Sequence, residues 1–374
     1  MRAVVAGVRY DVIVVGAGAM GSAAAWWLAR RGHRVLVADQ YEAGHVRGSS
    51  HGASRIFRLG YAQPEYAGMA LEARGLWREL EEASGERLLD PAGAVDYGRR
   101  EEMEPICRVL SQCGVRYEVL GPGAAARRWP GMRFDGDAVY QPDGACIRAD
   151  LVLRALHKGI REHGGDLRAG LGPASIEVQA DGVRVRAAGL AASAPVAVVA
   201  AGPWAAETLA GLVPLPPLTV TCEQVFYFQP ARAGCPWPCF IYRGDPPRFG
   251  LGTPGRGIKV GEHHTGPVVT ADTRSFDAEP AGRDRVIGFV RDRLPGLDPR
   301  PVSFETCLYT STPSEDFVVD RHGSIVVAAG FSGHGFKFTP LIGRLLADMA
   351  DGRRAAPELF RLSRPAAPVR RAHL

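Results

Sequence analysis

The glycine-rich run GAGAMG at residues 16–21 constrains this chain more than any other feature. It follows an apolar, β-branched run at 10–15, which is typical of a strand buried on both faces, and it precedes a helical stretch at 22–31. A second apolar run at 34–39 ends in Asp39. These segments form one β-α-β unit of about thirty residues. They predict that the chain begins with part of a parallel, nucleotide-binding sheet.

Each glycine of this run has its own role in a dinucleotide-binding loop. Gly16 permits the tight turn, Gly18 lets the backbone approach a pyrophosphate, and Gly21 allows the helix to pack closely on the strand. The phosphates then lie at the helix N-terminus, where free N–H groups favour negative charge. Asp39 can accept hydrogen bonds from ribose hydroxyls, which favours FAD or NAD over NADP. The loop does not choose between FAD and NAD, and a β-α-β turn without any ligand is the alternative interpretation.

Segments of mixed strand and helix character lie at the start, in the middle and at the end of the 374 residues. Between about 219 and 310 the chain is rich in short strands separated by Pro and Gly, with one helix near 283–293. This order predicts an α/β protein (α+β overall), in which a discontinuous Rossmann-like domain carries an inserted antiparallel-sheet substrate domain. The Pro-, Ala- and Arg-rich tail beyond Arg353 is expected on the surface. The expected ranges are 1–90, 145–218 and 305–374 for the Rossmann-like domain, and 91–144 and 219–304 for the substrate domain.

Charge and cysteine spacing argue against several kinds of site. The formal net charge of +5 is a mild excess, without the basic stripe of a nucleic-acid binder. No run of about twenty apolar residues predicts a membrane span. The seven cysteines are scattered, and Cys235 and Cys239 have no second pair with which to form a zinc site, so no metal is expected. The expected partners are therefore small molecules, with no nucleic acid and no membrane.

The two ends of the chain bear on its location. Residues 1–9 contain no long apolar stretch before a cleavage site, and this predicts a cytoplasmic protein. The Ala-, Arg-, Gly- and Pro-rich composition suggests a bacterial source. The C-terminal Ala372-His373-Leu374 resembles a peroxisomal address, which would act only if the source were eukaryotic.

Four further stretches resemble one family of flavoproteins. They are GSSHGASRIFR at 48–58, GIKVGEHH at 257–264, ETCLYT at 305–310 and GFSGHGFKF at 330–338. Together with the glycine-rich loop, and in the same order over nearly the whole chain, they resemble the monomeric sarcosine oxidase family of FAD-dependent amine oxidases. That family includes L-pipecolate oxidase and N-methyltryptophan oxidase. The Ser-Ser-His-Gly run and the paired histidines look most similar to the pipecolate oxidase branch.

The resemblance implies that the discontinuous domain is FAD-binding and that the protein is an oxidase of secondary α-amino acids. The substrate would be sarcosine, an N-methyl amino acid or a cyclic imino acid such as pipecolate, and the chain would act as a monomer. A hydride would pass from the carbon bound to nitrogen to the flavin. Reoxidation by O2 would then give an imine and H2O2.

The resemblance also assigns roles to individual residues. Cys307 matches the cysteine that carries FAD through a thioether at the flavin's 8α-methyl group, and Lys259 matches the lysine that activates O2. Arg58 and Lys337 match the pair that holds the substrate carboxylate, for which Arg offers a planar fork and Lys a point charge. Arg55 matches an arginine near the flavin that helps to set its potential. Without the resemblance, each of these would be interpreted as an ordinary core or surface side chain.

Further residues are expected to complete the site. His263 matches a histidine of the active-site wall, and Tyr309 lies two residues after Cys307, on the same face of an extended segment. Phe249 stands about where relatives carry a tyrosine, so one hydroxyl is missing, which favours a larger or more apolar amine than sarcosine. The loop 333–337 would turn N–H groups toward the flavin. The residues expected to bind FAD are Gly16, Gly18, Met20, Gly21, Asp39, Ser50, Arg55, Gly202, Trp204, Cys307, Gly333, His334, Gly335 and Lys337.

Three alternatives to this function stay open from the sequence. A flavin-dependent tailoring enzyme would oxidise a cyclic imino acid in a biosynthetic pathway. An NAD-dependent dehydrogenase would use the same loop and would be colourless. A non-catalytic FAD-binding protein would be yellow, but no amino acid would bleach it.

Overall fold

The structure, a computed structural model, describes residues 8–232 and 234–364. A six-stranded sheet in the order β10-β3-β2-β14-β21-β20 is parallel except for β20. The expected β-α-β unit is confirmed as β2, α1 (Ala19–Arg30) and β3, with the helix beginning at Ala19 rather than near Ser22. The strands are β2 (Val12–Val15), β3 (Val35–Ala38), β10 (Asp166–Arg168), β14 (Val196–Val199), β20 (Val318–His322) and β21 (Ile325–Ala329).

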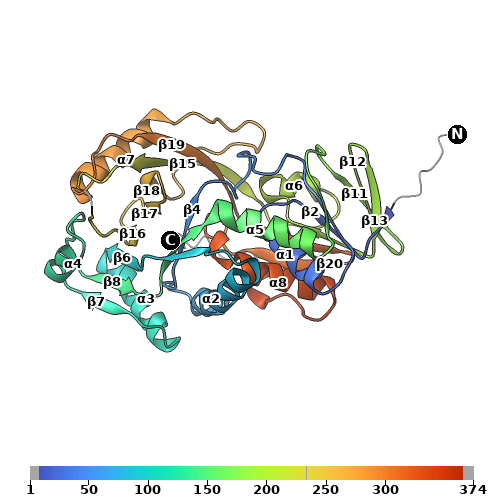
Figure 1. Ribbon diagram of the computed structural model, residues 1–374, viewed down its shortest axis with the longest axis horizontal. Helices are drawn as coiled ribbons and strands as arrows, with labels where there is room; N and C mark the ends of the chain where they lie inside the picture. Colours follow the sequence, from blue (N-terminus) through green and yellow to red (C-terminus); the bar gives the residue numbers. More distant parts are fainter. Residues whose placement is uncertain (1–7, 233, 365–374) are drawn as a thin grey trace.

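Alternate residues of this sheet belong to two different hydrophobic cores. Val12 and Val14 pack into a core with α1, α2 (Pro64–Ser84), α5 (Ala149–Glu162) and α8 (Thr339–Ala350), which lie together in Figure 1. Ile13 and Val15 pack into a second core beneath a four-stranded sheet of order β1-β13-β12-β11. Because successive side chains of a strand point to opposite faces, the continuous apolar run at 10–15 follows from coverage on both sides. The covering strands are β1 (Val8–Arg9), β11 (Ser175–Gln179), β12 (Gly182–Ala187) and β13 (Leu190–Ala194).

An eight-stranded sheet lies at the opposite end of the molecule from the four-stranded one (Figure 1). Its order is β19-β15-β18-β17-β16-β6-β8-β7, and it is antiparallel except between β16 and β6. Helix α7 (Pro280–Arg293) covers its outer face, and α7 begins where the Glu279 carboxylate accepts hydrogen bonds from the amides of Ala281 and Gly282. The strands are β6 (Ala94–Gly98), β7 (Glu118–Leu120), β8 (Ala138–Gln141), β15 (Thr219–Phe228), β16 (Cys239–Arg243), β17 (Arg248–Thr253), β18 (Gly257–Glu262) and β19 (Ser303–Ser311).

A small third sheet connects the two larger ones. In it β9 (Ala145–Arg148) pairs with both β4 (Ser54–Phe57) and β5 (Leu89–Pro91). Strand β4 contacts α5 on one side and β17 on the other, so the segment that contains Arg55 and Arg58 lies between the two main units. The remaining elements are α3 (Arg100–Gln112), α4 (Pro122–Arg128), α6 (Ala205–Thr208), η1 (Gly202–Trp204), η2 (Phe336–Phe338) and η3 (Glu358–Phe360).

The expected domain ranges remain a proposal, with one change. Strands β6, β7 and β8 lie in the same sheet as the strands of 219–304. The boundary expected at 305 falls inside β19, which pairs with β15 from Ser303 to Ser311. We therefore propose to place that boundary after Ser311.

The prediction that the tail lies on the surface is wrong for its first part. Phe360 is buried, and its ring centroid lies 5.3 Å from that of Phe317 and 6.0 Å from that of Tyr66. The Arg364 guanidinium donates to the Asp316 carboxylate at 2.9 Å. A Pro-rich composition did not reveal this single aromatic anchor, whose burial removes a large apolar surface from water. The C-terminal tripeptide 372–374 lies outside the described residues.

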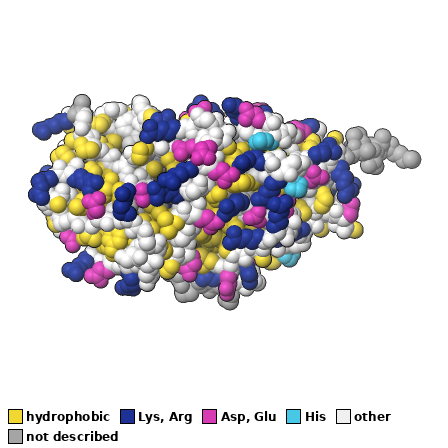
Figure 2. All heavy atoms as spheres, turned by 60° about the horizontal axis from the view of Figure 1, so that its bottom comes forward, with side chains coloured by type: hydrophobic (Ala, Val, Ile, Leu, Met, Phe, Trp, Pro, Cys, Tyr) yellow, Lys and Arg dark blue, Asp and Glu magenta, His cyan; other side chains and the backbone are white. Residues whose placement is uncertain are grey.

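Charges of both signs mix on the surface. On the face shown in Figure 2, Lys and Arg side chains are interspersed with Asp and Glu. Within the described residues, no helix combines the length and the apolar character needed to cross a membrane.

Candidate active site

The glycine-rich loop joins β2 to α1 and lies against β14. Gly16 has a φ of +101°, and a Cβ placed on it would lie 2.4 Å from the carbonyl oxygen of Ala200. A Cβ on Gly21 would lie 1.9 Å from the Gly16 carbonyl oxygen, so Gly21 serves the packing of the helix on its own loop. Gly18 meets only the Ser50 side chain, with Oγ 3.1 Å from such a Cβ. Only glycine meets these demands at Gly16 and Gly21, because any other residue there would collide with backbone.

Asp39 fixes the loop as well as lining the cavity beside it. Its carboxylate accepts hydrogen bonds from the amide of Ala17 at 2.5 Å and from that of Tyr41 at 2.9 Å. The Ser50 hydroxyl accepts a hydrogen bond from the Ala19 amide at 3.0 Å, at the first turn of α1. One carboxylate and one hydroxyl therefore hold the loop and the helix N-terminus in a fixed arrangement.

One cavity of about 770 Å³ extends from this loop to β19 and to the loop before α8. Two predicted site residues do not line it. Gly21 faces the Gly16 carbonyl of its own loop, and His263 is buried with its Nδ1 3.4 Å from the Tyr309 hydroxyl. The predicted residues that do line the cavity are Gly16, Gly18, Met20, Asp39, Ser50, Arg55, Arg58, Gly202, Trp204, Phe249, Lys259, Cys307, Tyr309, Gly333, His334, Gly335 and Lys337.

Two buried cations, Arg58 and Lys337, meet at one tyrosine in this cavity. The Arg58 guanidinium lies 4.2 Å from the centre of the Tyr61 ring, and the Lys337 Nζ donates to the Tyr61 hydroxyl at 2.8 Å. Lys337 also donates to the carbonyl of His334 at 2.9 Å. Burial, followed by repulsion from Arg58, holds the pKa of Lys337 well below its ordinary value. An anion bound between Arg58 and Lys337 would relieve this repulsion.

A buried polar network behind Arg58 fixes the backbone that carries it. The Asp96 carboxylate accepts two hydrogen bonds from Arg243, at 3.0 and 2.6 Å, and one from the Gln141 amide at 2.7 Å. The oxygen of the Gln141 amide accepts hydrogen bonds from the backbone amides of Leu59 and Gly60. Sequence reasoning did not assign a role to this network. The acid within the apolar strand AVDYG at 94–98 was its one visible signal.

The Asp96–Arg243 pair predicts a large stability effect. Asp96→Ala is expected to lower the free energy of unfolding by about 3–5 kcal/mol, because it leaves a buried guanidinium without a counter-charge. Urea unfolding followed by circular dichroism measures this. Arg300→Ala is the control, since it removes a pair with Asp298 in which the arginine side chain is 88% exposed, and its midpoint should hardly move. Equal midpoints for the two variants would contradict the role given to Asp96.

Lys259 is buried on β18 and points at the segment before Arg55. Its Nζ donates to the carbonyl of Ser54 at 2.5 Å. Burial and, second to it, the Arg55 guanidinium together lower the pKa of Lys259 to about 7, with the Glu305 carboxylate acting in the opposite direction. Lys259 is therefore an ammonium that can lose its proton near neutral pH.

Arg55 closes the segment 49–55 onto itself. Its guanidinium donates to the carbonyls of Ser49 at 3.0 Å, His51 at 2.5 Å and Ser54 at 2.9 Å, and lies 5.5 Å from the Phe336 ring centre. Among the described residues, its hydrogen bonds go to backbone carbonyls and to no carboxylate, so no hydrogen-bonded counter-ion offsets its positive charge. Arg55 can therefore act on an electron-rich group in the cavity.

Strand β19 presents alternate residues to the cavity. Glu305, Cys307 and Tyr309 all line it, as residues two apart on a strand should. The Cys307 sulfur lies 3.6 Å from the carbonyl oxygen of Ser49. The Tyr309 ring packs against Gly333, where an added Cβ would lie 2.3 Å from a ring carbon.

His263 is buried beside Tyr309 and lies near the cavity cations Arg58 and Lys337, whose charges act on it. Burial, followed by the adjacent His264, holds the pKa of His263 well below its ordinary value, so this ring is neutral near pH 7. The ring centroids of His263 and His264 are 4.1 Å apart. His264 adopts a φ of +56°, because the chain turns there at the end of β18.

Two residues at the glycine-loop end of the cavity were missed from the sequence. Tyr41 lies 5.4 Å from the Trp204 ring, and the Trp204 indole donates to Asp272 at 2.9 Å. His157 of α5 contacts the carbonyl of Ala17 at 3.1 Å. A single tyrosine or histidine in an amphipathic segment has no sequence pattern that distinguishes a residue of the site from one elsewhere in the fold.

Comparison with known proteins places this geometry in a family. A family model described as FAD dependent oxidoreductase matches residues 11–349. The chain is 35% identical to the peroxisomal sarcosine oxidase of Homo sapiens, an alignment that covers 95% of this chain and 96% of that protein. It is 31% identical to the monomeric sarcosine oxidase of Bacillus sp. (strain NS-129), covering 96% and 97%.

A solved structure agrees with the sequence relatives. NikD, described as an unusual amino acid oxidase essential for nikkomycin biosynthesis, matches with a TM-score of 0.85 and 30% identity, over 96% of this chain and 99% of NikD. The likeness therefore extends over both main sheets and the cavity between them. The chain belongs to the FAD-dependent oxidoreductase family, within the group of that family that contains the sarcosine oxidases.

Proposed function

We propose that this chain is an FAD-dependent oxidase of secondary α-amino acids, such as sarcosine, N-methyl amino acids or cyclic imino acids. One observation carries the proposal: a single cavity joins the glycine-rich loop to the buried cations Arg58 and Lys337 and to Lys259. A dinucleotide loop, a place for a carboxylate and a separate ammonium are the parts that this reaction requires. The sarcosine oxidases among the relatives support the same substrate class.

The residues present fit FAD. The cavity has the volume of a cofactor site, and the backbone at Gly16 leaves no room for a side chain. We propose that Gly16, Gly18 and Asp39 hold the adenine dinucleotide half and that the loop 333–337 holds the flavin half. When bound, FAD accepts the two electrons released at the carbon–nitrogen bond and passes them to O2, giving an imine and H2O2.

The chain's own residues orient the substrate and set its charge. Arg58 and Lys337 bind the carboxylate, which fixes the position of the neighbouring carbon. The amine must be neutral to release a hydride, and the same two cations lower the pKa of the bound amine, as does exclusion of water. Phe249 lines the cavity without a hydroxyl, which supports a substrate more apolar than sarcosine.

A pH dependence follows from Lys259. Since its pKa is lowered to about 7, the ammonium form predominates below that pH and is lost as the pH rises through it. We expect the second-order rate constant for O2 to fall as the pH rises through about 7. Stopped-flow mixing of the reduced enzyme with O2 over pH 5.5–9 would measure this, and a rate that is flat or rises across that range would contradict it.

We further propose that Cys307 carries the flavin covalently. It lines the cavity from strand β19, with its sulfur 3.6 Å from the Ser49 carbonyl oxygen. Acid denaturation should leave the yellow colour with the precipitated wild-type protein and release it to the supernatant from Cys307→Ser. Colour released from the wild type would show that the link is absent.

A biosynthetic tailoring role is the second candidate, because the NikD likeness covers nearly the whole of both chains. Screening sarcosine, N-methyl amino acids and cyclic imino acids with peroxide detection separates the two roles. Turnover of free sarcosine or pipecolate at high kcat/KM favours the first, and turnover of only an elaborated cyclic imino acid favours the second.

We also propose that the protein works as a monomer in the bacterial cytoplasm, with an amino acid and O2 as its partners. The loop, the two cations and Lys259 of a single chain supply the parts named for the reaction, so the proposed site needs no residue from a second copy. Size-exclusion chromatography with light scattering tests the proposal, and a dimer would overturn it.

A further inference from the structure

Glu223 is the cross-strand partner of Cys307. In the antiparallel pair of β15 and β19, Glu223 lies directly opposite Cys307. Directly opposed residues point to the same face, with their Cβ atoms about 4.5–5.5 Å apart. Both residues line the cavity. Glu223 is therefore the cross-strand neighbour of the cysteine that is proposed to carry the flavin.

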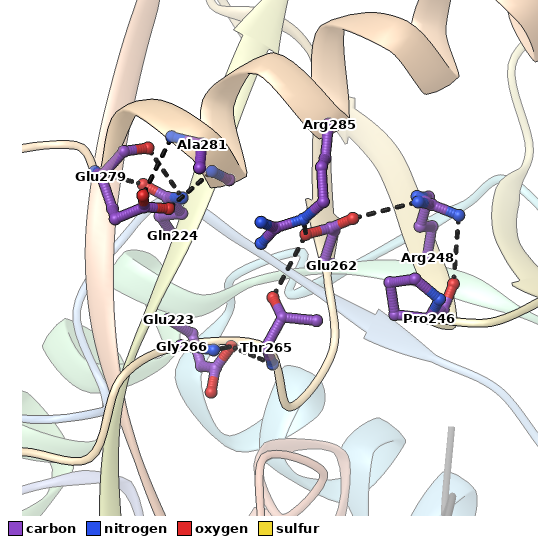
Figure 3. Close-up of polar contacts among 11 residues, drawn as sticks. Glu223, Gln224, Pro246, Arg248, Glu262, Thr265, Gly266, Glu279, Ala281 and Arg285 are labelled. Atoms are coloured by element: carbon purple, nitrogen blue, oxygen red, sulfur yellow. Dashed lines mark hydrogen bonds and ion pairs between the residues drawn. The ribbon is translucent and has the colours of Figure 1, made fainter.

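The Glu223 carboxylate is buried and holds no cation. Its side chain accepts a hydrogen bond from the Thr221 hydroxyl at 2.7 Å. It also accepts hydrogen bonds from the amides of Thr265 and Gly266 at 3.2 and 3.0 Å, which Figure 3 shows. Within the described parts of the chain it makes no ion pair, and the residue is 2% exposed. A carboxylate has about four lone-pair sites, so three hydrogen bonds leave capacity for one more.

A second buried glutamate nearby shows the contrast. Glu262 accepts hydrogen bonds from Arg248 at 3.1 Å and Arg285 at 2.8 Å, and both pairs are drawn in Figure 3. Its charge is thus neutralised by two guanidinium groups. Burial raises the pKa of Glu223 above its ordinary value, and the three hydrogen bonds only partly oppose this. Glu223 is therefore a stronger base than an exposed glutamate, and the structure gives it no cation to neutralise.

We propose that Glu223 accepts the thiol proton of Cys307 when the thioether to the flavin forms. This rests on the proposed covalent link at Cys307. A thiol becomes an effective nucleophile only when it loses its proton, and no other free carboxylate stands directly opposite Cys307 in its sheet. Glu305 lies two residues away on the same face, but it is bound by Arg256 and by the Tyr227 hydroxyl.

The sulfur–hydrogen bond of Cys307 breaks, its proton passes to Glu223, and its electron pair forms the bond to the 8α carbon. One carbon–hydrogen bond of that methyl group breaks as well. Its proton goes to solvent, and its electron pair is taken up through the ring system by O2, the oxidant of the proposed activity. With the two protons released, O2 becomes H2O2.

The test measures attachment rather than turnover. Full-length protein produced under riboflavin limitation is mixed with FAD in air, and acid-stable flavin is followed by fluorescence on denaturing gels. Glu223→Gln keeps the shape and removes the base, so the rate of attachment should fall about a hundredfold, the lower range for loss of a general base. Glu223→Asp should recover part of the rate. The yellow colour of non-covalently bound FAD in each variant reports that the cavity is still formed.

Glu262→Gln is the matched control, because it removes a buried carboxylate of the same cavity that does not face Cys307. Its attachment rate should equal that of the wild type. A wild-type rate in Glu223→Gln would overturn the role of Glu223 while leaving the link at Cys307 intact. Absence of acid-stable flavin in the wild type would instead refute the link itself, and the role of Glu223 with it.

Discussion

Arg58→Ala is expected to lower kcat/KM for the amino acid by about a hundredfold or more. Removing one member of a buried charge pair costs about 2–5 kcal/mol, and roughly 1.4 kcal/mol corresponds to a factor of ten. Arg58 is buried in the cavity with Lys337, and both are proposed to hold the substrate carboxylate. Oxygen consumption measured over a range of substrate concentrations gives the change in kcat/KM.

A second substrate, the corresponding amine without a carboxylate, tests whether the effect of Arg58→Ala comes from the carboxylate contact. It is expected to be a poor substrate of the wild type and to react nearly as well with Arg58→Ala, because the lost contact does not exist for it. The difference between the two substrates isolates the carboxylate contact, as in a double-mutant cycle. If the variant lost activity equally toward both substrates, Arg58 would serve the fold rather than the carboxylate. Arg58→Lys should retain part of the rate through its charge, without the planar fork.

Lys259→Met is expected to slow the reaction of the reduced enzyme with O2 by about 10²–10³-fold, the range for loss of one fixed group that stabilises a developing anion. Reduction by the amino acid under anaerobic conditions should change much less, because Arg58 and Lys337 stay in place. Stopped-flow measurement of the two half-reactions separates these effects. The variant should also lose the pH dependence near 7.

Lys158→Met is the control, because it removes one lysine charge at a position outside the cavity. Lys158 lies on α5 with its side chain 66% exposed and paired with Glu162, away from β18. Both half-reactions of this variant should match those of the wild type. If Lys259→Met slowed reduction and reoxidation to the same degree, a general disturbance of the cavity would explain its effect better than a role toward O2.

The local sequence was enough to predict the dinucleotide-binding loop, because the geometry of the loop depends on residues within one β-α-β unit and on the strand beside it. The demands on Gly16 and Gly21 come from backbone within the same β-α-β unit and from β14 beside it, so the spacing of the glycines records them directly. The same holds for the continuous apolar strands, since coverage on both faces leaves a periodicity that can be read without coordinates. The alternation of Cys307 and Tyr309 on β19 is likewise a local property of an extended chain.

The register between strands and the burial of polar side chains could not be predicted from the local sequence. Glu223 faces Cys307 only because β15 and β19 pair in one register, and a shift by one residue would turn the carboxylate to the other face. Asp96, Gln141 and Arg243 come from three strands that are distant in sequence. His263 was expected in the cavity wall, and this stays a prediction: the residue is buried with its Nδ1 3.4 Å from the Tyr309 hydroxyl.

The sequence by itself therefore determined the nucleotide-binding loop, the class of fold and the family. The tertiary structure alone decided which charged and reactive residues are neighbours: Arg58 with Lys337, Asp96 with Arg243, and Glu223 opposite Cys307. The physical reason is that turn chemistry and side-chain periodicity are local properties. The electrostatics of a buried site depend instead on distances between segments that only the packing of the sheets brings together.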